Sequence, residues 1–225
     1  MLRFIVSLCL VLIILLVPGR AVAHRPIFAV ENSCPSEAIA INDPLISWAI
    51  YAELTPGAVD YYTFTAEEQL DFYAQMTIPT LKPETGFAPA FALVGPGLGE
   101  APPDFPGAVF QGHGVEVFLP TQIQRTFFEP FTQTRYWIRQ EQRITLGPGD
   151  YYLLVYNPEA EGGRYTLAVG EEEAWTWRDL LAFPQLWLRV RWWYNPFQTV
   201  AILVGLGIII GLVIRLLLRL RTQRG

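Results

Sequence analysis

The chain has 225 residues, of which 52% are hydrophobic, and a formal net charge of −5. Its charges are unevenly spread, because all 21 acidic residues lie between Glu31 and Asp179, while the stretch from Arg25 to Arg191 holds ten basic residues. A surface of that sign repels phosphate backbones, so we expect no nucleic-acid partner. About 150 to 170 residues lie between two apolar ends, which is the size of one domain with one core.

The first apolar segment has the features of a secretory signal peptide. Arg3 precedes an apolar run from Phe4 to Val17, and Ala21-Val22-Ala23 offers small residues at the two positions that signal peptidase reads. We expect residues 1–23 to be removed, which leaves His24 as the mature N-terminus. The alternative is that this segment stays in place as an uncleaved anchor helix.

A series of short strands is predicted next. Residues 59–64 and 70–78 alternate between apolar and polar side chains, which is the period of a strand with one buried face, and residues 66–69 between them indicate a hairpin. Glycine and proline separate the later runs, at residues 90–94, 115–119, 143–146, 151–156 and 164–169. This spacing predicts an all-β ectodomain over residues 24–170, folded as an antiparallel β-sandwich.

The order of these elements resembles that of bacterial pre-peptidase C-terminal domains. The resemblance rests on Val59–Phe64, the strand with Phe72 and Met76, Ala92–Gly97, Gly149–Val155 and Gly163–Val169. It implies a small jelly-roll-like β-sandwich that serves as an accessory module and binds or presents rather than catalyses. Residues 100–142 are longer than the corresponding connection in such domains, and long insertions are where function is often placed.

Within this insertion, residues 127–139 combine five aromatic side chains with charged ones. If the segment is exposed, it forms a recognition surface, because aromatic residues and arginine are the commonest interface anchors. If it is covered, it packs over the sandwich, as large aromatic side chains usually do. The residues predicted for the recognition surface are Phe128, Glu129, Phe131, Arg135 and Trp137.

The two histidines suggest a metal site. A free α-amine and an imidazole on His24 can chelate an ion together, imidazole suits copper, and His113 could complete a set of three nitrogen ligands. The arrangement is similar to the histidine brace of periplasmic copper carriers. The alternative is that both histidines are solvated or hydrogen-bonded. No other cofactor is expected.

Catalytic motifs are missing from the sequence. No Gly-x-Ser-x-Gly elbow, His-Glu-x-x-His zinc motif or phosphate-binding glycine loop occurs. The carboxylate pairs Asp60 with Asp71 and Glu116 with Glu129 could act as acid and base, but in a chain this acidic they are more often solvated. After removal of the signal peptide only Cys34 remains, which excludes an intramolecular disulfide, and we expect this thiol to be buried.

Residues 171–196 predict an amphipathic juxtamembrane helix that lies on the membrane. Thr176 can cap this helix, and we expect Pro184 to kink or split it. Tryptophan rings settle at the headgroup level of a bilayer and arginine side chains reach toward lipid headgroups. The residues predicted to make these lipid contacts are Trp187, Trp192, Trp193, Arg178, Arg189 and Arg191.

Residues 197–218 form a run long enough to cross a membrane as one transmembrane helix. Arg215 and Arg219 are predicted to lie at the membrane interface, and together with the basic tail, residues 219–225, they indicate a cytoplasmic C-terminus by the positive-inside rule. Gly207 and Gly211 are spaced for a helix homodimer, although glycine is common in membrane helices in any case.

The sequence therefore predicts a single-pass protein of the cell membrane with its sandwich outside the cytoplasm. We expect it to contact membrane lipid and to bind without catalysis, as an accessory subunit of another membrane protein. The alternative is an extracytoplasmic copper-binding protein that uses His24 and His113.

Overall fold

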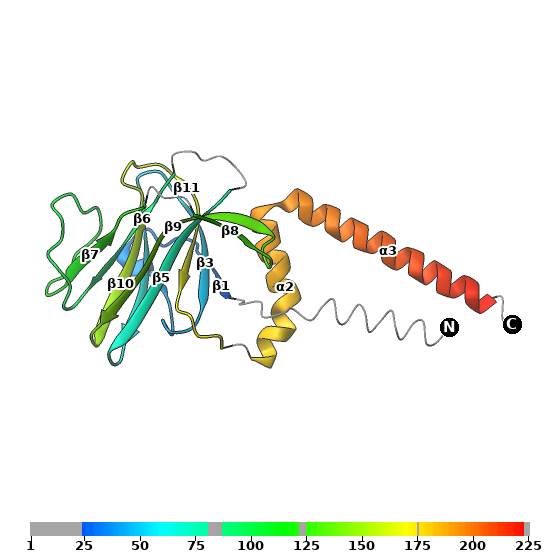
Figure 1. Cartoon of the computed structure of the whole chain (residues 1–225), viewed down its shortest axis with the longest axis horizontal. Coiled ribbons are helices and arrows are strands. Elements are labelled where there is room, and N and C mark those ends of the chain that lie inside the picture. The colour runs from blue at the N-terminus through cyan, green and yellow to red at the C-terminus, as the bar shows by residue number, and fades with distance from the viewer. Residues whose placement is uncertain (1–23, 81–86, 122–124, 175, 223–225) are drawn as a thin grey trace.

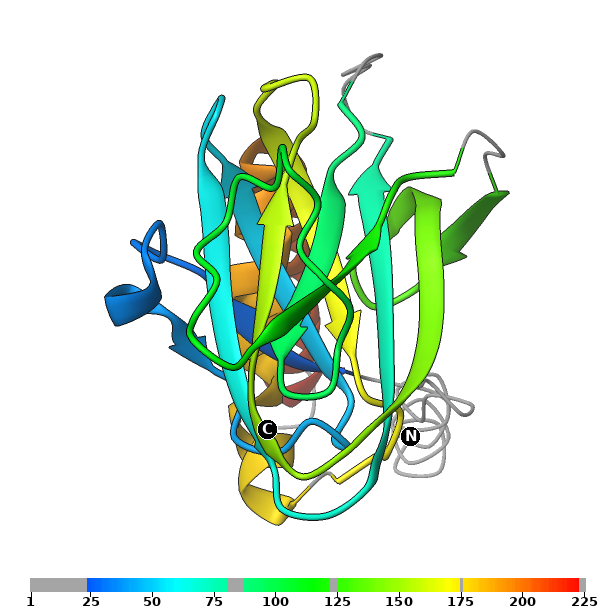
Figure 2. The ribbon, with the colours of Figure 1, turned by 90° about the vertical axis from the view of Figure 1, so that its left-hand side faces the viewer.

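The structure, a computed structural model, describes residues 24–80, 87–121, 125–174 and 176–222. The predictions for residues 1–23 and for the last three residues of the tail lie outside this part of the chain. Two β-sheets pack face to face, and two helices follow them (Figures 1 and 2). The predicted β-sandwich is confirmed.

The six-stranded sheet and the five-stranded sheet divide the strands between them without regard to chain order. The six-stranded sheet has the order β1 (Arg25–Phe28), β3 (Trp48–Leu54), β11 (Gly163–Val169), β5 (Leu70–Pro79), β9 (Thr134–Leu146), β8 (Arg125–Glu129). The five-stranded sheet has the order β2 (Ile39–Ala40), β4 (Val59–Ala66), β10 (Gly149–Tyr156), β6 (Ala90–Gly95), β7 (Gly114–Phe118). A 3-10 turn, η1 (Pro35–Glu37), precedes β2. The pairs β1–β3 and β2–β4 are parallel, and the other pairs are antiparallel.

The core lies between the sheets, where the alternating apolar side chains meet. Phe64 of β4 stacks on Phe72 of β5 and on Tyr151 of β10, with ring centroids 4.9 and 5.4 Å apart. The prediction of a hairpin at residues 66–69 is wrong, because β4 and β5 belong to different sheets. The short connection crosses from one sheet to the other at the end of the sandwich.

Residues 100–142 supply strands to both sheets. They contain β7 and β8, which are the end strands of the five-stranded and the six-stranded sheet, and the first part of β9. The preceding loop folds back over the outer face of the five-stranded sheet, where Phe105 and Phe110 pack against its strands. We call this surface the loop-covered face.

Helix α2 (Trp177–Tyr194) lies on the outer face of the six-stranded sheet, which we call the helix-covered face. The Thr176 side chain accepts a hydrogen bond from the Asp179 backbone, and the Asp179 carboxylate accepts one from the Thr176 backbone, so the predicted cap is confirmed as a capping box. The helix continues through Pro184 as one element of 18 residues, so it is not split there.

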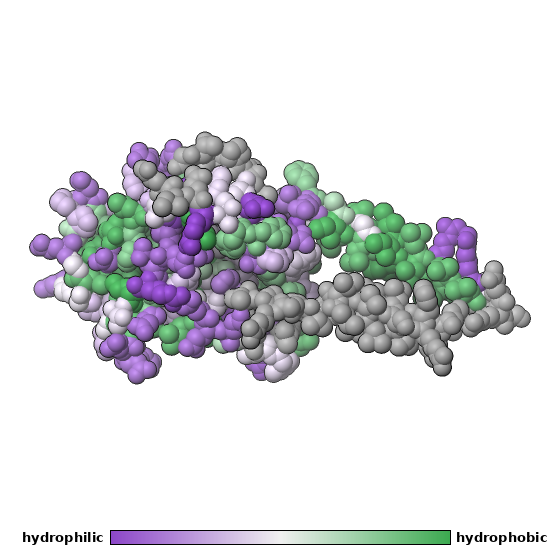
Figure 3. Space-filling model, in the orientation of Figure 1, coloured by the Kyte–Doolittle hydropathy of each residue, from purple (hydrophilic) through white to green (hydrophobic). Residues whose placement is uncertain are grey.

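Helix α3 (Pro196–Thr222) follows α2, with the single residue Asn195 between them. Asn195 forms the corner, because its backbone leaves the helical range and its side-chain oxygen accepts a hydrogen bond from the Gln198 backbone. Within the described residues one helix is long and apolar enough to cross a membrane: Pro196–Leu220 has a mean hydropathy of 2.8, and none of its most apolar window is buried. Figure 3 shows its apolar surface extending away from the sandwich.

Candidate functional site

Aromatic side chains join α2 to the helix-covered face. Tyr194 of α2 lies edge-on to Tyr51 of β3 and to Tyr136 of β9, with centroid distances of 5.7 Å in both pairs. Its hydroxyl is 2.7 Å from the Thr166 hydroxyl of β11. Val190 is buried beside these rings. The helix therefore shares a small core of its own with three strands of the sheet.

Hydrogen bonds and one ion pair fix both ends of α2. At its start, the Arg25 guanidinium of β1 lies 2.8 Å from the Asp179 carboxylate. At its end, Arg164 of β11 donates a 2.8 Å hydrogen bond to the Trp193 carbonyl, and its guanidinium lies over the Trp193 ring. We call the contact region between α2 and the six-stranded sheet, with Asp179, Val190, Trp193 and Tyr194 on the helix side, the joint. Trp193 is half-buried within it.

Arg191 does not point toward lipid headgroups as predicted. Its side chain is 1% exposed and donates a hydrogen bond to the Thr132 carbonyl in the turn between β8 and β9. Arg191 lies on the side of α2 that faces the hairpin, and its side chain therefore reaches this turn rather than solvent. Burial of the guanidinium lowers the pKa of Arg191.

Residues 127–139 lie in the β8–β9 hairpin, where some of the side chains are covered and others are exposed. Phe127 stacks on Tyr136 with ring centroids 5.3 Å apart, and Phe131 meets Phe183 of α2 edge-on at the same distance. These rings form part of the joint. Phe128, by contrast, is 53% exposed.

Phe128 and Arg135 are cross-strand neighbours and both are exposed, so they remain available as a recognition surface. Trp137 is half-buried and packs against the core, with the Arg139 guanidinium 5.5 Å from its ring. Trp137 lies on the same hairpin face as Phe128 and Arg135, two residues along β9 and against the core, so strand alternation in the sequence does not separate it from them.

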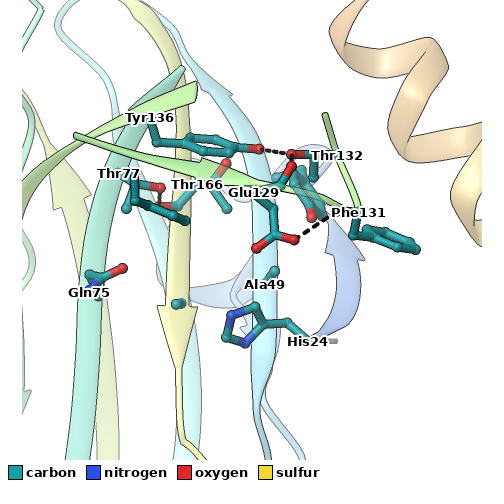
Figure 4. A pocket seen from close by; sticks show the side chains of 12 residues that line it. His24, Ala49, Gln75, Thr77, Glu129, Phe131, Thr132, Tyr136 and Thr166 are labelled. Carbon is teal, nitrogen blue, oxygen red and sulfur yellow. Dashed lines mark hydrogen bonds between the residues drawn. The ribbon is translucent and has the colours of Figure 1, made fainter. Parts of the chain in front are cut away.

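A small cavity of about 40 Å³ lies between the hairpin and the helix-covered face (Figure 4). His24, Gln75, Thr77, Glu129 and Phe131 are among the residues that line it. The Glu129 carboxylate accepts a 2.9 Å hydrogen bond from the Phe131 backbone, and its partial burial raises its pKa. A space of this size holds a water molecule rather than an organic substrate.

His24 and His113 lie on opposite sides of the sandwich. His24 lines the cavity on the helix-covered face, where its Nδ1 lies within hydrogen-bonding distance of the Ser47 hydroxyl and burial lowers its pKa. His113 packs on Phe110, which stacks on Tyr152 of the loop-covered face. The structure does not bring these two histidines together. In the described part of the chain, no group of three or more His, Cys, Asp or Glu side chains is arranged to hold a metal ion.

The two carboxylate pairs also separate. Asp60 is buried rather than solvated, and it accepts a 2.6 Å hydrogen bond from the Tyr165 hydroxyl, while burial raises its pKa to about 6. Asp71 is exposed on a strand of the other sheet, and Glu116 and Glu129 likewise belong to different sheets. Asp60 lies on the same face of β4 as the buried Tyr62 and Phe64, because the three residues are two positions apart. This spacing was the signal in the sequence that Asp60 is buried.

The remaining predicted positions vary in exposure. Cys34 is only partly buried, with its Sγ 3.1 Å from the Ser36 hydroxyl and from the Glu37 carboxylate, so the prediction of a buried thiol is wrong. The residues with exposed side chains include Trp192, Arg178, Arg189, Arg215 and Arg219, whereas Trp187 is half-buried. These exposed positions lie on α2 away from the joint or on α3.

No protein-family model and no curated protein matches the chain. Among solved structures, it is similar to the pre-peptidase C-terminal domain of a collagenase from Bacillus anthracis. The identity is 18%, the match covers 58% of this chain and 91% of that domain, and the TM-score is 0.31. This is the family that the order of the strands resembles. The match concerns the fold alone, and nothing about a ligand or partner follows from it.

Proposed function

We propose that the protein is a membrane-anchored interaction protein without catalytic activity, an accessory subunit for another membrane protein. The joint between sandwich and helices carries the proposal, because α2 is packed against the sheet and only the single residue Asn195 separates it from the span-length helix α3. Such a joint fixes the orientation of the sandwich relative to the membrane. An accessory subunit needs this, since its binding surface must meet a partner held in the same bilayer.

In this proposal α3 is the transmembrane helix and its C-terminus is cytoplasmic. Its apolar surface is long enough to cross the hydrocarbon core. Arg215 and Arg219 are exposed near its end, and Arg221 and Arg224 follow, which favours the cytoplasmic side by the positive-inside rule. The sandwich then lies on the extracytoplasmic side.

The partner surface that we propose is the side of the β8–β9 hairpin opposite α2. Phe128 and Arg135 form an exposed aromatic and cationic pair there, the residue types that most often anchor interfaces. Strand β8 is the end strand of its sheet, so among the described strands only β9 pairs with it. An end strand can also accept a strand from a partner protein.

Affinity capture from native membranes tests the partner surface. We expect the variant F128A/R135A to recover about tenfold less partner than the wild-type chain, because one interface anchor commonly contributes about 1.4 kcal/mol or more. The matched control is E67A/E68A, which truncates two exposed residues in the connection between β4 and β5. Equal recovery with the hairpin variant and the control would contradict the proposed surface.

We also propose that α3 forms a homodimer through Gly207 and Gly211. Both glycines are exposed, and a Cβ atom added at either position meets nothing within 4 Å, so packing inside the described chain does not require glycine there. Close backbone approach of a second helix would explain them. We expect G207L/G211L to abolish chemical cross-linking of the full chain in vesicles, while I209L/I210L retains it. Cross-linking that survives in the glycine variant would rule out this dimer.

A further inference from the structure

One side of α2 carries a continuous apolar stripe that the sandwich does not cover. Its members are three to four residues apart, which places them on one side of a helix. Trp177, Leu181 and Trp192 are 65%, 74% and 56% exposed, although they are among the larger apolar side chains of the molecule. The full stripe is Trp177, Leu181, Pro184, Leu188 and Trp192, of which Leu188 is half-buried.

Arginine side chains border the stripe on one flank. Arg178 is exposed, with its guanidinium 5.4 Å from the Trp177 ring. Arg189 is also exposed and lies 4.2 Å from the Phe28 ring at the edge of the sandwich. A band of tryptophan and leucine beside arginine is typical of helices that lie in the boundary between headgroups and acyl chains.

The direction of α3 identifies what covers the stripe. Helix α2 runs across the direction of α3, and it lies between the sandwich and the length of α3 (Figure 1). The stripe is opposite the side that contacts the sheet, so it faces the side toward which α3 extends. If α3 crosses a bilayer, Asn195 lies at the bilayer surface and α2 must leave it nearly along that surface.

We infer that the stripe from Trp177 to Trp192 docks on the lipid bilayer, so that the six-stranded sheet faces the membrane and the five-stranded sheet faces away from it. The inference rests on the proposed transmembrane role of α3. It also explains why α2 has apolar side chains on two sides, since one side packs on Tyr51 and Tyr136 and the other enters the lipid. The lipid surface thereby orients the sandwich as a whole.

Site-directed spin labelling of the full chain tests this orientation. In a C9S/C34S background, one nitroxide is attached at L181C on the stripe and another, in a separate variant, at E116C on β7, an exposed site on the far sheet. The chain is reconstituted in vesicles of phosphatidylcholine with phosphatidylglycerol. We expect the Leu181 label to be accessible to dissolved oxygen and to lose its collisions with a water-soluble nickel chelate, and the Glu116 label to show the reverse.

A second pair of variants tests whether the stripe itself maintains the contact. With the label at Q185C beside the stripe, W177S/L181S should raise its accessibility to the nickel chelate, because apolar area buried in the lipid is lost. The exposed control E67A/E68A should leave it unchanged. Both changed residues are exposed, so the packing of α2 on the sheet remains.

Two results would overturn the inference. One is a Leu181 label as open to the nickel chelate as the Glu116 label. The other is a Leu181 label that is shielded in native membranes but open to water in pure lipid vesicles, which would make a protein the occupant. Either result is separate from the capture experiment on Phe128 and Arg135, so failure of the proposed partner surface and failure of the lipid contact can be told apart.

Discussion

The two outer faces of the sandwich are covered in different ways. The loop-covered face is closed by the chain that connects β6 to β7, through the contacts of Phe105 with Tyr156 and of Phe110 with Tyr152. The helix-covered face is closed by an element from the far end of the sequence, which uses rings, an ion pair and the buried Arg191. The first cover stays within the sandwich, whereas the second connects the sandwich to the long apolar helix α3.

This difference teaches that α2 is part of the folded domain rather than a linker. A flexible stalk would leave the helix-covered face open, with Tyr51 and Tyr136 in water. Instead these rings and Tyr194 are buried together, so removing the helix exposes a hydrophobic surface of the sheet. The folded unit therefore includes α2 as well as the sandwich, and predictions that separate the two covers follow from it.

The largest effect is expected from Y194A. Truncating this buried ring removes its edge-on contacts with Tyr51 and Tyr136 of the sheet and the hydrogen bond to Thr166, and buried aromatic truncations cost about 3–5 kcal/mol. The measurement is urea unfolding of the full chain in detergent. The matched variant F105A, in the loop on the loop-covered face, should lose less free energy of unfolding, because the Phe105 ring is only half-buried. A smaller loss for Y194A than for F105A would mean that α2 is not part of the cooperative unit.

A smaller and pH-dependent effect on the free energy of unfolding is expected from E129Q, at the cavity on the helix-covered face. The pKa of Glu129 is raised in the folded state, so its contribution to stability is present below its ordinary pKa and is lost as pH rises through the raised pKa. At pH 7 the glutamine variant should therefore be more stable than the wild type, and the difference should shrink toward pH 4. Unfolding midpoints measured across this range check it.

The control for Glu129 is E116Q on the end strand of the other sheet, where the carboxylate is exposed. It should leave the pH dependence of unfolding as it is in the wild type. If both glutamine variants behave alike, partial burial of the Glu129 carboxylate is not the cause of the effect at Glu129.

Much of the fold could be predicted from local patterns, because strand alternation and a capping residue are properties of neighbouring positions. The strand of residues 59–64 and the Thr176 cap are examples that the structure confirms. The partner sheet of each strand was not predictable in this way. Residues 66–69 are short enough for a hairpin, but β4 pairs with β10 and β5 with β11, so the long-range pairing decided the crossing.

The candidate site was harder to predict because α2 has apolar side chains on two sides. Helical periodicity identifies both sides but does not say which one meets the sheet. The prediction therefore placed Arg191 and Trp193 among the lipid contacts, although both belong to the joint. The hairpin posed the same problem. Alternation places Phe127 and Phe128 on opposite faces, but it does not say which of the two faces is covered.

The smallest effect is expected from R191M, which asks whether the buried charge itself stabilises the helix cover. Among the described residues, the guanidinium of Arg191 has one hydrogen-bond partner, the Thr132 carbonyl, and its Nε and Nη2 have none. That carbonyl also accepts a hydrogen bond from the Thr134 hydroxyl, so it stays paired when the guanidinium is removed. Replacing a buried charge with an apolar side chain of similar volume is often neutral or stabilising.

We therefore expect the free energy of unfolding of R191M to stay within about 1 kcal/mol of the wild-type value or to exceed it. R191A should lose about 2 kcal/mol or more, because it leaves a cavity between α2 and the β8–β9 turn. Urea unfolding of both variants separates filled volume from charge. If methionine costs as much as alanine, the charge is what holds α2 to the hairpin, and the two covers of the sandwich differ in their chemistry as well as in their place in the chain.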